Sequence, residues 1–284
     1  MADRLEGRVA LITGAGRGIG AAIALKLASE GAQLVLNDLD AAPLEETARA
    51  VGRLGHDAVT VAGDITRPEL PELVVNSALQ QFGRLDIIVN NAGYTWDNVI
   101  QKMQDEQWQA ILDVHLTAPF RILRAASAHI RDATKQEREA GQVVFRKVVN
   151  ISSISAMLGV AGQANYSSAK AGIIGLTRAM AREWGRYHVN VNCVAFGLIE
   201  TRLAQASGTQ AAKIDVDGKK INIGVQAANL EAQKQSIPLG RAGTPEEAAG
   251  AVWKIGTLAA AGYAASPKQV RLRTPDQASR WRLL

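Results

Sequence analysis

Three side chains whose types could move a proton lie in the middle of the chain. Tyr166 and Lys170 are four residues apart in a segment with a helical pattern, so a phenol and an ammonium share one helix face. Ser153 follows a short apolar run that predicts a strand. An ammonium stabilises a phenolate, which suits proton transfer at a substrate oxygen. A Tyr–Lys pair at this spacing is also common by chance, so an exposed surface pair is the alternative.

A glycine cluster near the start of the chain predicts a nucleotide site. Residues 9–13 form an apolar run that leads into Thr13-Gly14-Ala15-Gly16-Arg17-Gly18-Ile19-Gly20, and a helical pattern follows. Glycines let a backbone approach a pyrophosphate, whose charge the N-terminus of the helix stabilises. For a glycine cluster taken by itself, a plain strand–helix turn is the alternative.

Asp38 ends the second apolar run and bears on which dinucleotide is bound. A carboxylate there can accept hydrogen bonds from ribose hydroxyls and would repel a 2′-phosphate, so NAD(H) is favoured. Arg17, inside the glycine loop, argues for NADP(H), because a guanidinium could bind that phosphate. We expect NAD(H) and keep NADP(H) as possible. The alternative for Asp38 is that it merely starts the next turn.

Apolar runs and helical patterns alternate along most of the 284 residues. Strands are expected at residues 9–13, 33–37, 58–62, 85–90, 148–151 and 189–195, and helices at residues 21–30, 45–54, 107–130 and 164–184. Thr66-Arg67-Pro68-Glu69 is expected to open a further helix as a capping box. This alternation predicts an α/β protein with a single-domain Rossmann fold, doubly wound, with a mostly parallel sheet and helices on both faces. We place this domain at residues 1–252 and an atypical basic C-terminal tail at residues 253–284.

Two polar stretches have the character of surface insertions. Residues 131–147 are highly charged and are expected to extend the preceding helix. Residues 206–236 follow the last expected strand, at the sheet edge where ligands bind in open α/β folds, so they are a candidate substrate lid. Within them, Asp217-Gly218 between two short apolar segments predicts a hairpin.

Charge and composition argue against other classes of protein. The formal net charge is +5, and all of it lies from Val252 onward, where Asp276 is the single acid among the basic residues Lys254, Lys268, Arg271, Arg273, Arg280 and Arg282. The rest of the chain is balanced, so we expect no nucleic-acid partner. Neither metal-ligand spacing, nor a signal core, nor an apolar segment of membrane length is recognisable, so no metal and no membrane partner is expected. Cys193 is the single cysteine, which favours a reducing, cytoplasmic location.

In combination, the motifs resemble the short-chain dehydrogenase/reductase family. Residues 13–20, Asn90-Asn91-Ala92-Gly93, Asn150-Ile151-Ser152-Ser153 and Tyr166-Ser167-Ser168-Ala169-Lys170 occur in the family's order and at its spacings, over about residues 5–252. The resemblance implies a Rossmann-fold, NAD(P)-dependent oxidoreductase that transfers hydride between nicotinamide and a carbonyl or alcohol. It also implies a homodimer or homotetramer.

The resemblance implies roles for individual residues as well. Ser153, Tyr166 and Lys170 would be catalytic: Tyr166 would give or take the proton, Lys170 would lower the pKa of Tyr166 and bind ribose, and Ser153 would orient the substrate oxygen. The expected cofactor contacts are Gly14, Gly18, Ile19 and Gly20 at the pyrophosphate, Asp38 at the adenosine ribose, Asp64 and Ile65 at the adenine, Asn90, Ala92 and Gly93 at the central strand and nicotinamide ribose, and Ile199 and Thr201 at the carboxamide.

Two internal positions depart from the usual family pattern. His115 stands where the family usually has an Asn that supports a water in the proton relay; it could hold that water or be a packing residue. Phe196-Gly197 replaces the usual Pro-Gly. Both changes resemble a branch of 3-oxoacyl-ACP reductases and 3-hydroxyacyl-CoA dehydrogenases. A 3-oxoacyl thioester on acyl-carrier protein or coenzyme A is therefore the leading substrate, and an alcohol, sugar or steroid is the alternative.

The third departure is the C-terminus. The family usually continues into an apolar helix and a last strand with paired glycines, and neither that strand nor the glycine pair is recognisable after Val252. We hypothesise an altered reading frame at this end. Such a change would affect tetramer formation and activity, and it allows the alternative of a catalytically impaired nucleotide-binding protein. An intact coding frame, with relatives that carry the same tail, would refute the hypothesis.

Overall fold

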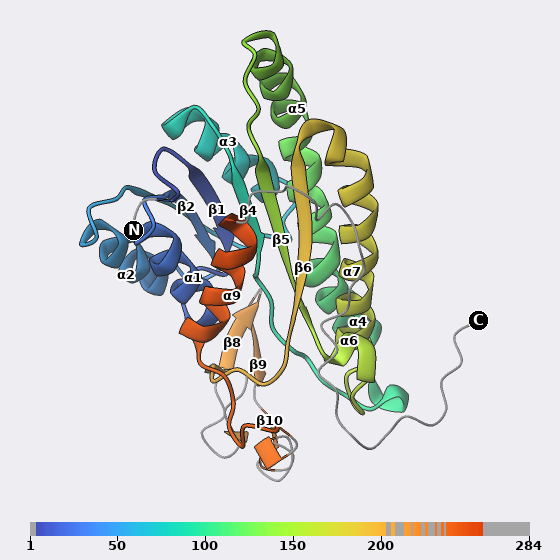
Figure 1. Ribbon diagram of the computed structural model, residues 1–284. Helices are drawn as coiled ribbons and strands as arrows, with labels where there is room; N and C mark the ends of the chain where they lie inside the picture. The colour runs from blue at the N-terminus through green and yellow to red at the C-terminus, as the bar shows by residue number, and fades with distance from the viewer. Residues whose placement is uncertain are drawn as a thin grey trace.

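A six-stranded parallel sheet forms the centre of the protein in this computed structural model (Figure 1). The structure describes residues 4–202, 206–207, 213–216, 218–222, 225–226, 231, 234–235 and 237–257. The strands are β1 (Val9–Thr13), β2 (Gln33–Asp38), β3 (Ala58–Ala62), β4 (Ile87–Asn90), β5 (Arg146–Ser153) and β6 (Val189–Phe196). Their order is β3-β2-β1-β4-β5-β6, with every pair parallel. The order reverses between β1 and β4, which is where a doubly wound fold opens a ligand crevice.

Helices cover both faces of the sheet (Figure 1). The first face carries α1 (Gly18–Ala28), α2 (Ala41–Gly52) and α9 (Pro245–Thr257), and the second carries α3 (Leu70–Phe82), α5 (Ala118–Glu139) and α7 (Ala164–Trp184). Each face of the sheet forms a hydrophobic core with its helices, and successive strand residues point to opposite cores. Ile12 packs with α1, α2 and α9, while Leu11 packs with α3, α5 and α7. Because the strands are buried on both faces, their sequences are nearly continuous apolar runs. The predicted Rossmann fold is confirmed.

The expected helix over residues 107–130 is divided by one wide turn. α4 (Asp105–Leu112) ends, the π-helical turn η2 (Asp113–Thr117) follows, and α5 begins at once. His115 lies in η2 and is 4% exposed. Such a turn adds one residue to the helical repeat and often marks a functional site. The apolar periodicity does not reveal the extra residue, so the sequence predicted one continuous helix where the structure has α4 and α5.

The expected capping box at residues 66–69 is wrong. α3 begins at Leu70 with Glu69 as its N-cap, and Glu69 makes no side-chain cap hydrogen bond within the described chain. The N–H of Thr66 instead donates to Asp64 Oδ1 (2.9 Å), which forms a turn before the helix. Pro71 has no backbone N–H to donate within a helix, so it fits in the first turn of α3, and a helix that started at residue 66 would place it in the interior.

The charged stretch 131–147 is a surface insertion only in its first part. α5 extends to Glu139 as expected, but Arg146 and Lys147 begin β5 and are 3% and 7% exposed. Arg146 makes a bidentate ion pair with Glu137 (2.9 and 2.5 Å), and Lys147 donates to the side chain of Asn190. Because each cation is paired or hydrogen-bonded, it can be buried at the start of a strand.

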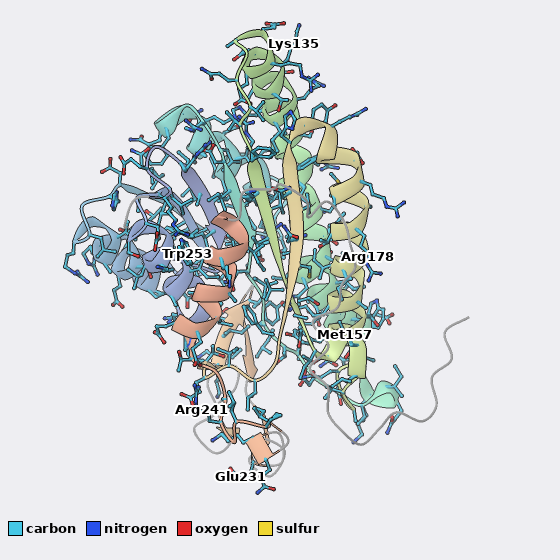
Figure 2. All side chains as sticks on the ribbon, in the orientation of Figure 1. Lys135, Met157, Arg178, Glu231, Arg241 and Trp253 are labelled. Carbon is cyan, nitrogen blue, oxygen red and sulfur yellow. The ribbon has the colours of Figure 1, made fainter. Side chains whose placement is uncertain are left out.

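Helix α9 crosses the expected domain boundary at Val252. It continues to Thr257 and packs along α1, with the Lys26 ammonium 4.3 Å from the ring centroid of Trp253 (Figures 1 and 2). Within the described residues the sheet ends at β6. Residues 258–284, which hold most of the expected tail, lie outside the described part of the chain.

The expected hairpin after β6 is confirmed. β8 (Lys213–Val216) and β9 (Lys219–Asn222) pair antiparallel, with Ile214 opposite Ile221, which is 3% exposed. Gly218 has a φ of 79°, as a tight hairpin turn requires, and Asp217 lies outside the described residues. Much of the candidate lid at residues 206–236 also lies outside them, so the lid stays a prediction. None of the helices in the described ranges has both the length and the apolar character needed to cross a membrane.

Asp86 ties the amino end of β4 to β1. Its side chain is 2% exposed and accepts hydrogen bonds from Arg84 (2.7 Å to each oxygen), Arg8 (2.8 Å) and the N–H of Val9 (3.0 Å). Burial by itself would raise the pKa of Asp86, but these bonds outweigh it and hold the pKa below the usual 3.8. The stabilisation is therefore present above the ordinary carboxyl pKa and is lost as the pH falls through the lowered value.

We predict that Asp86→Ala lowers the free energy of unfolding by about 3 kcal/mol, because two guanidinium groups and an N–H lose their acceptor. Urea unfolding measures the change. Asp132→Ala is the control, because its pair with Arg131 is 61% exposed on both sides, and it should cost less than about 1 kcal/mol. Equal losses in the two variants would contradict the role given to Asp86.

Candidate active site

Three consecutive residues of β5 dock α7, the helix that carries Lys170. Asn150 Nδ2 donates to Thr177 Oγ1 (2.9 Å), and Ser152 Oγ donates to the carbonyl of Lys170 (2.8 Å). In return, Lys170 Nζ donates to the carbonyl of Ile151 (2.7 Å). All of these groups are buried, so their polar atoms need the partners that this one arrangement supplies.

The structure brings Ser153, Tyr166 and Lys170 together at the carboxyl end of β5. Ser153 ends β5, while Tyr166 and Lys170 lie one turn apart on α7. The Lys170 ammonium is 5.6 Å from the ring centroid of Tyr166, and Ser153 hydrogen-bonds Tyr166. Lys170 is 4% exposed and Tyr166 is half-buried, so the alternative of an exposed surface pair is wrong.

Burial sets the protonation of this group. It raises the pKa of Tyr166 to about 12, against the lowering effect of the Ser153 hydrogen bond. It lowers the pKa of Lys170 to about 8. The pKa of Tyr166 is therefore raised overall and not lowered as expected, because burial removes hydration from the phenolate. At neutral pH the site holds a neutral phenol beside a largely charged ammonium.

His115 stands edge-on to Tyr166, with ring centroids 5.1 Å apart and an interplanar angle of 87°. Its Nε2 is 2.8 Å from the carbonyl oxygen of Tyr94. A carbonyl can only accept, so Nε2 carries the hydrogen and Nδ1 carries a lone pair. Nδ1 is buried and has no hydrogen-bond partner among the described residues. Burial lowers the pKa of His115 well below 6.5, and the charge of Lys170 lowers it further, so the ring is neutral.

The glycine loop is packed so closely that side chains do not fit at two positions. A Cβ on Gly20 would lie 1.9 Å from the carbonyl oxygen of Gly14, and one on Gly14 would lie 2.8 Å from Ala92 Cα. Gly18, with a φ of 53°, begins α1, whose N-terminus carries no side-chain cap within the described chain. First-turn N–H groups at such an end suit an anion, so the loop fits a dinucleotide pyrophosphate.

Asn91 ties the glycine loop to β4, a role that the sequence analysis did not assign. Its Nδ2 donates to the carbonyls of Thr13 (2.9 Å) and Gly14 (3.1 Å). Thr13 Oγ1 in turn accepts from the N–H groups of Asn91 (3.1 Å) and Ala92 (3.0 Å). The place of Asn91 within the Asn-Asn-Ala-Gly motif was the signal that could have identified it.

Charges of both signs gather where the adenosine ribose is expected. Asp38 accepts from the N–H of Gly16 (2.8 Å) and, through its other oxygen, from the N–H of Asp40 (3.2 Å). Arg17 pairs with the Asp40 carboxylate (2.5 Å). Arg202, from the segment after β6, is close enough to Arg17 that repulsion adds to burial in lowering its pKa. No sequence motif singles out Arg202, so it was not among the expected site residues.

The residues expected at the adenine differ in how much surface they offer. Asp64 follows β3, and its carboxylate accepts the N–H of Thr66. Ile65 is 4% exposed and packs in the core under α3 and α5, so little of its side chain remains for a ligand. Ile19, in the first turn of α1, packs partly against the opposite core.

The residues expected at the nicotinamide end make separate contacts with β5, with the glycine loop and with the segment before α9. Asn90 Nδ2 donates to Asn150 Oδ1 (2.7 Å), which links β4 to the network that docks α7. Thr201 lies over the glycine loop, with its Cγ2 3.3 Å from where a Cβ on Gly18 would stand. Ile199 forms a parallel bridge with Gly243. No cluster of His, Cys, Asp and Glu that could hold a metal occurs among the described residues.

Exposed apolar side chains follow Ser153 directly. They come from Ile154, the short helix α6 (Ser155–Leu158) and the residues after it. Ile154, Met157, Leu158 and Val160 are 41%, 62%, 78% and 39% exposed, and Met157 is labelled in Figure 2. Apolar side chains gathered on a surface next to a polar group commonly bind the apolar part of a ligand.

Known proteins similar to this chain agree on one family. The family described as short chain dehydrogenase matches residues 8–212. A 3-oxoacyl-[acyl-carrier-protein] reductase of Vibrio cholerae is 39% identical over 249 residues, which cover 87% of this chain and 89% of that protein. Hydroxyacyl-CoA dehydrogenase ChsB1 of Mycobacterium tuberculosis is 42% identical over 223 residues, which cover 77% and 68%. The solved structure of a short-chain type dehydrogenase/reductase from Mycobacterium marinum has a TM-score of 0.74 and 28% identity, and the match covers 89% of each chain.

Gly93 and His115 interlock, which gives a test of the site's packing. A Cβ on Gly93 would lie 2.0 Å from Cε1 of His115. We predict that Gly93→Ala lowers the free energy of unfolding by about 2 kcal/mol, because the ring must move. In a His115→Ala background the same change should cost much less, and urea unfolding of the four proteins measures the coupling.

Gly175→Ala is the control for this cycle. A Cβ on Gly175, in the middle of α7, would meet no atom within 4 Å, so the change should be neutral or stabilising. An equal cost of Gly93→Ala with and without the His115 ring would show that the contact is not what excludes a side chain at position 93.

Proposed function

Because the chain belongs to the short-chain dehydrogenase family, we propose that this NAD(P)-dependent oxidoreductase reduces 3-oxoacyl thioesters, on acyl-carrier protein or coenzyme A, to 3-hydroxyacyl thioesters. The observation that carries the proposal is the neutral Tyr166 beside Ser153 and the charged Lys170, next to exposed apolar side chains. The similarity to a 3-oxoacyl-[acyl-carrier-protein] reductase of Vibrio cholerae and a hydroxyacyl-CoA dehydrogenase of Mycobacterium tuberculosis supports the same acyl thioester chemistry.

The roles of the three catalytic residues follow from their positions. The substrate carbonyl oxygen would accept hydrogen bonds from Ser153 Oγ and the Tyr166 hydroxyl, which stabilise the negative charge that develops there. When bound, the nicotinamide supplies the hydride to the carbonyl carbon. Tyr166 donates its proton to the oxygen, and the Lys170 ammonium stabilises the phenolate that remains. A pKa of about 12 keeps the proton on Tyr166 at neutral pH, so the phenol is present in the form that donates a proton during reduction.

His115 has a separate part in this proposal. Its neutral ring carries a lone pair on Nδ1, next to the catalytic tyrosine and under the influence of the Lys170 charge. That lone pair can accept a hydrogen bond from a water on the route by which the proton returns to Tyr166. Its Nδ1 is buried and has no hydrogen-bond partner among the described residues, which favours this role over simple packing.

We propose NAD(H) as the preferred cofactor. The Asp38 carboxylate lies against the glycine loop, where it would repel a 2′-phosphate, and Asp40 already pairs with Arg17. A homodimer or homotetramer in the cytoplasm remains part of the proposal. The oligomer rests on the family, and the location rests on the single cysteine, Cys193.

We predict that the purified protein oxidises NADH when acetoacetyl-CoA is added, and that NADPH reacts at least about tenfold more slowly because of the Asp38 charge. The change in nicotinamide absorbance measures both rates. Tyr166→Phe should lower turnover on the order of 10³-fold while NADH still binds, since only the proton donor is lost.

Each other outcome has a distinct meaning. Turnover with NADPH alone would keep the reductase assignment and show that Arg17 outweighs Asp38. Turnover with simple ketones and not with the thioester would favour the alcohol, sugar or steroid alternative. Unimpaired turnover by Tyr166→Phe would contradict the catalytic assignment.

We predict that the rate of reduction falls as the pH rises through about 8, because burial lowers the pKa of Lys170 to that value and its ammonium is lost above it. The measurement is kcat with saturating thioester and NADH from neutral to alkaline pH. Lys170→Arg, whose charge persists in this range, should turn over more slowly but without the fall. The same alkaline fall in Lys170→Arg would assign it to another group.

A further inference from the structure

The connection after β4 is clamped to the first turn of α7. The N–H of Asn98 donates to the carbonyl of Gly162 (2.9 Å). Asn165, which is fully buried, donates from Nδ2 to the carbonyl of Trp96 (3.1 Å). These bonds join two segments that are far apart in the sequence and hold the connection beside the turn that leads into Tyr166.

The clamp holds one carboxylate, that of Asp97, at the N-cap of α7, three residues before Tyr166. Gln163, the N-cap of α7, donates from Nε2 to Asp97 Oδ2 (2.7 Å). As a whole residue Asp97 is exposed, yet packing around its carboxylate removes enough water to raise its pKa. The negative charge of Asp97 in turn raises the pKa of Tyr166. Gln163 therefore holds the Asp97 carboxylate in place, and the charge of this carboxylate acts on the Tyr166 hydroxyl.

The other groups that face Tyr166 carry no negative charge at neutral pH. Ser153 contributes a hydroxyl from β5, Lys170 an ammonium from α7, and His115 a neutral ring from η2. Cys193 of β6 interacts with Lys170, and burial raises the pKa of its thiol. Among the described residues, Asp97 is thus the carboxylate that acts on Tyr166.

The negative charge of Asp97 would affect which carbonyl compounds can react at this site. In a free 3-oxo acid, the carboxylate is separated from the reacting carbonyl carbon by a single carbon atom. Because Gln163 holds Asp97 at the start of α7, three residues before Tyr166, this carboxylate would approach Asp97 when the carbonyl oxygen reaches Tyr166. Like charges at this separation repel, whereas a thioester or ester at the same place is neutral.

We propose that Asp97 is a specificity-determining residue that disfavours free 3-oxo acids and leaves neutral 3-oxoacyl esters and thioesters as substrates. The inference rests on the proposed reductase function of the same site. The negative charge that Gln163 holds in place on Asp97 would oppose the attraction of an anionic substrate to the cationic Lys170.

The test compares acetoacetate with its ethyl ester, two 3-oxo compounds that differ in the charge next to the reacting carbonyl. With NADH, the wild-type protein should have a higher kcat/KM for the ester. Asp97→Asn keeps the shape and an acceptor for Gln163, and it should raise the acetoacetate-to-ester ratio of kcat/KM about fivefold. Asp97→Glu keeps the charge and should retain the preference for the ester.

Asp105→Asn is the matched control, because it removes an exposed carboxylate from the first turn of the neighbouring helix α4. It should leave the ratio unchanged. An Asp97→Asn variant whose ratio is the same as that of the wild type would overturn the proposal. A shift of equal size in Asp105→Asn would also overturn it, because the effect would then be one of overall charge.

A binding measurement separates failure of this inference from failure of the proposed function. Binding of acetoacetate and of the ester to the protein–NADH complex is followed by tryptophan fluorescence. If neither compound is reduced, but Asp97→Asn tightens acetoacetate binding about fivefold relative to the ester, the proposed reaction fails and the role of Asp97 stands. If the relative binding of the two compounds does not change, or neither compound binds to either protein, the role of Asp97 is overturned.

Discussion

Buried hydrogen bonds between β5 and α7 hold Ser153, Tyr166 and Lys170 in register. Asn150, Ser152 and Ile151 each bond to α7, so the helix has one position in which all of these polar groups are satisfied. A shift of the helix would leave buried donors and acceptors without partners, which costs more free energy than the bonds themselves contribute. The distance between the end of β5 and the tyrosine of α7 is thereby fixed, and the rest of the site is arranged around it.

Close backbone packing supplies the second constraint. Gly20 lies against the carbonyl of Gly14, and Asn91 binds the same carbonyl from β4, so the nucleotide loop and the central strand are one unit. Gly93 leaves room for His115, whose ring then stands against Tyr166. The glycine loop and the group around Tyr166 therefore meet through contacts in which neither side can move independently.

Burial sets the protonation states of the side chains in this site. It disfavours the charged forms of Tyr166 and His115 and lowers the pKa of Lys170 toward neutrality. A site of this kind holds its proton on the phenol and keeps a cation ready for the phenolate, which suits an acid better than a base. Asp97, at the end of a clamp from another segment, adds a negative charge to this balance.

The sequence determined the order of the strands along the chain, the helix that carries Tyr166 and Lys170, and the hairpin with Ile214 opposite Ile221, because apolar periodicity and glycine placement are local signals. It also identified Ser153, Tyr166 and Lys170, which the structure brings together. Only the tertiary structure decided the rest. The wide turn at His115 does not alter the apolar pattern, and the burial of Arg146 depends on its pairing with Glu137. The bond from Gln163 to Asp97 joins residues 66 positions apart, and the pKa of Tyr166 depends on how much water the whole fold removes from around it. Distances and hydration of this kind arise from packing between distant segments, and no local spacing encodes them.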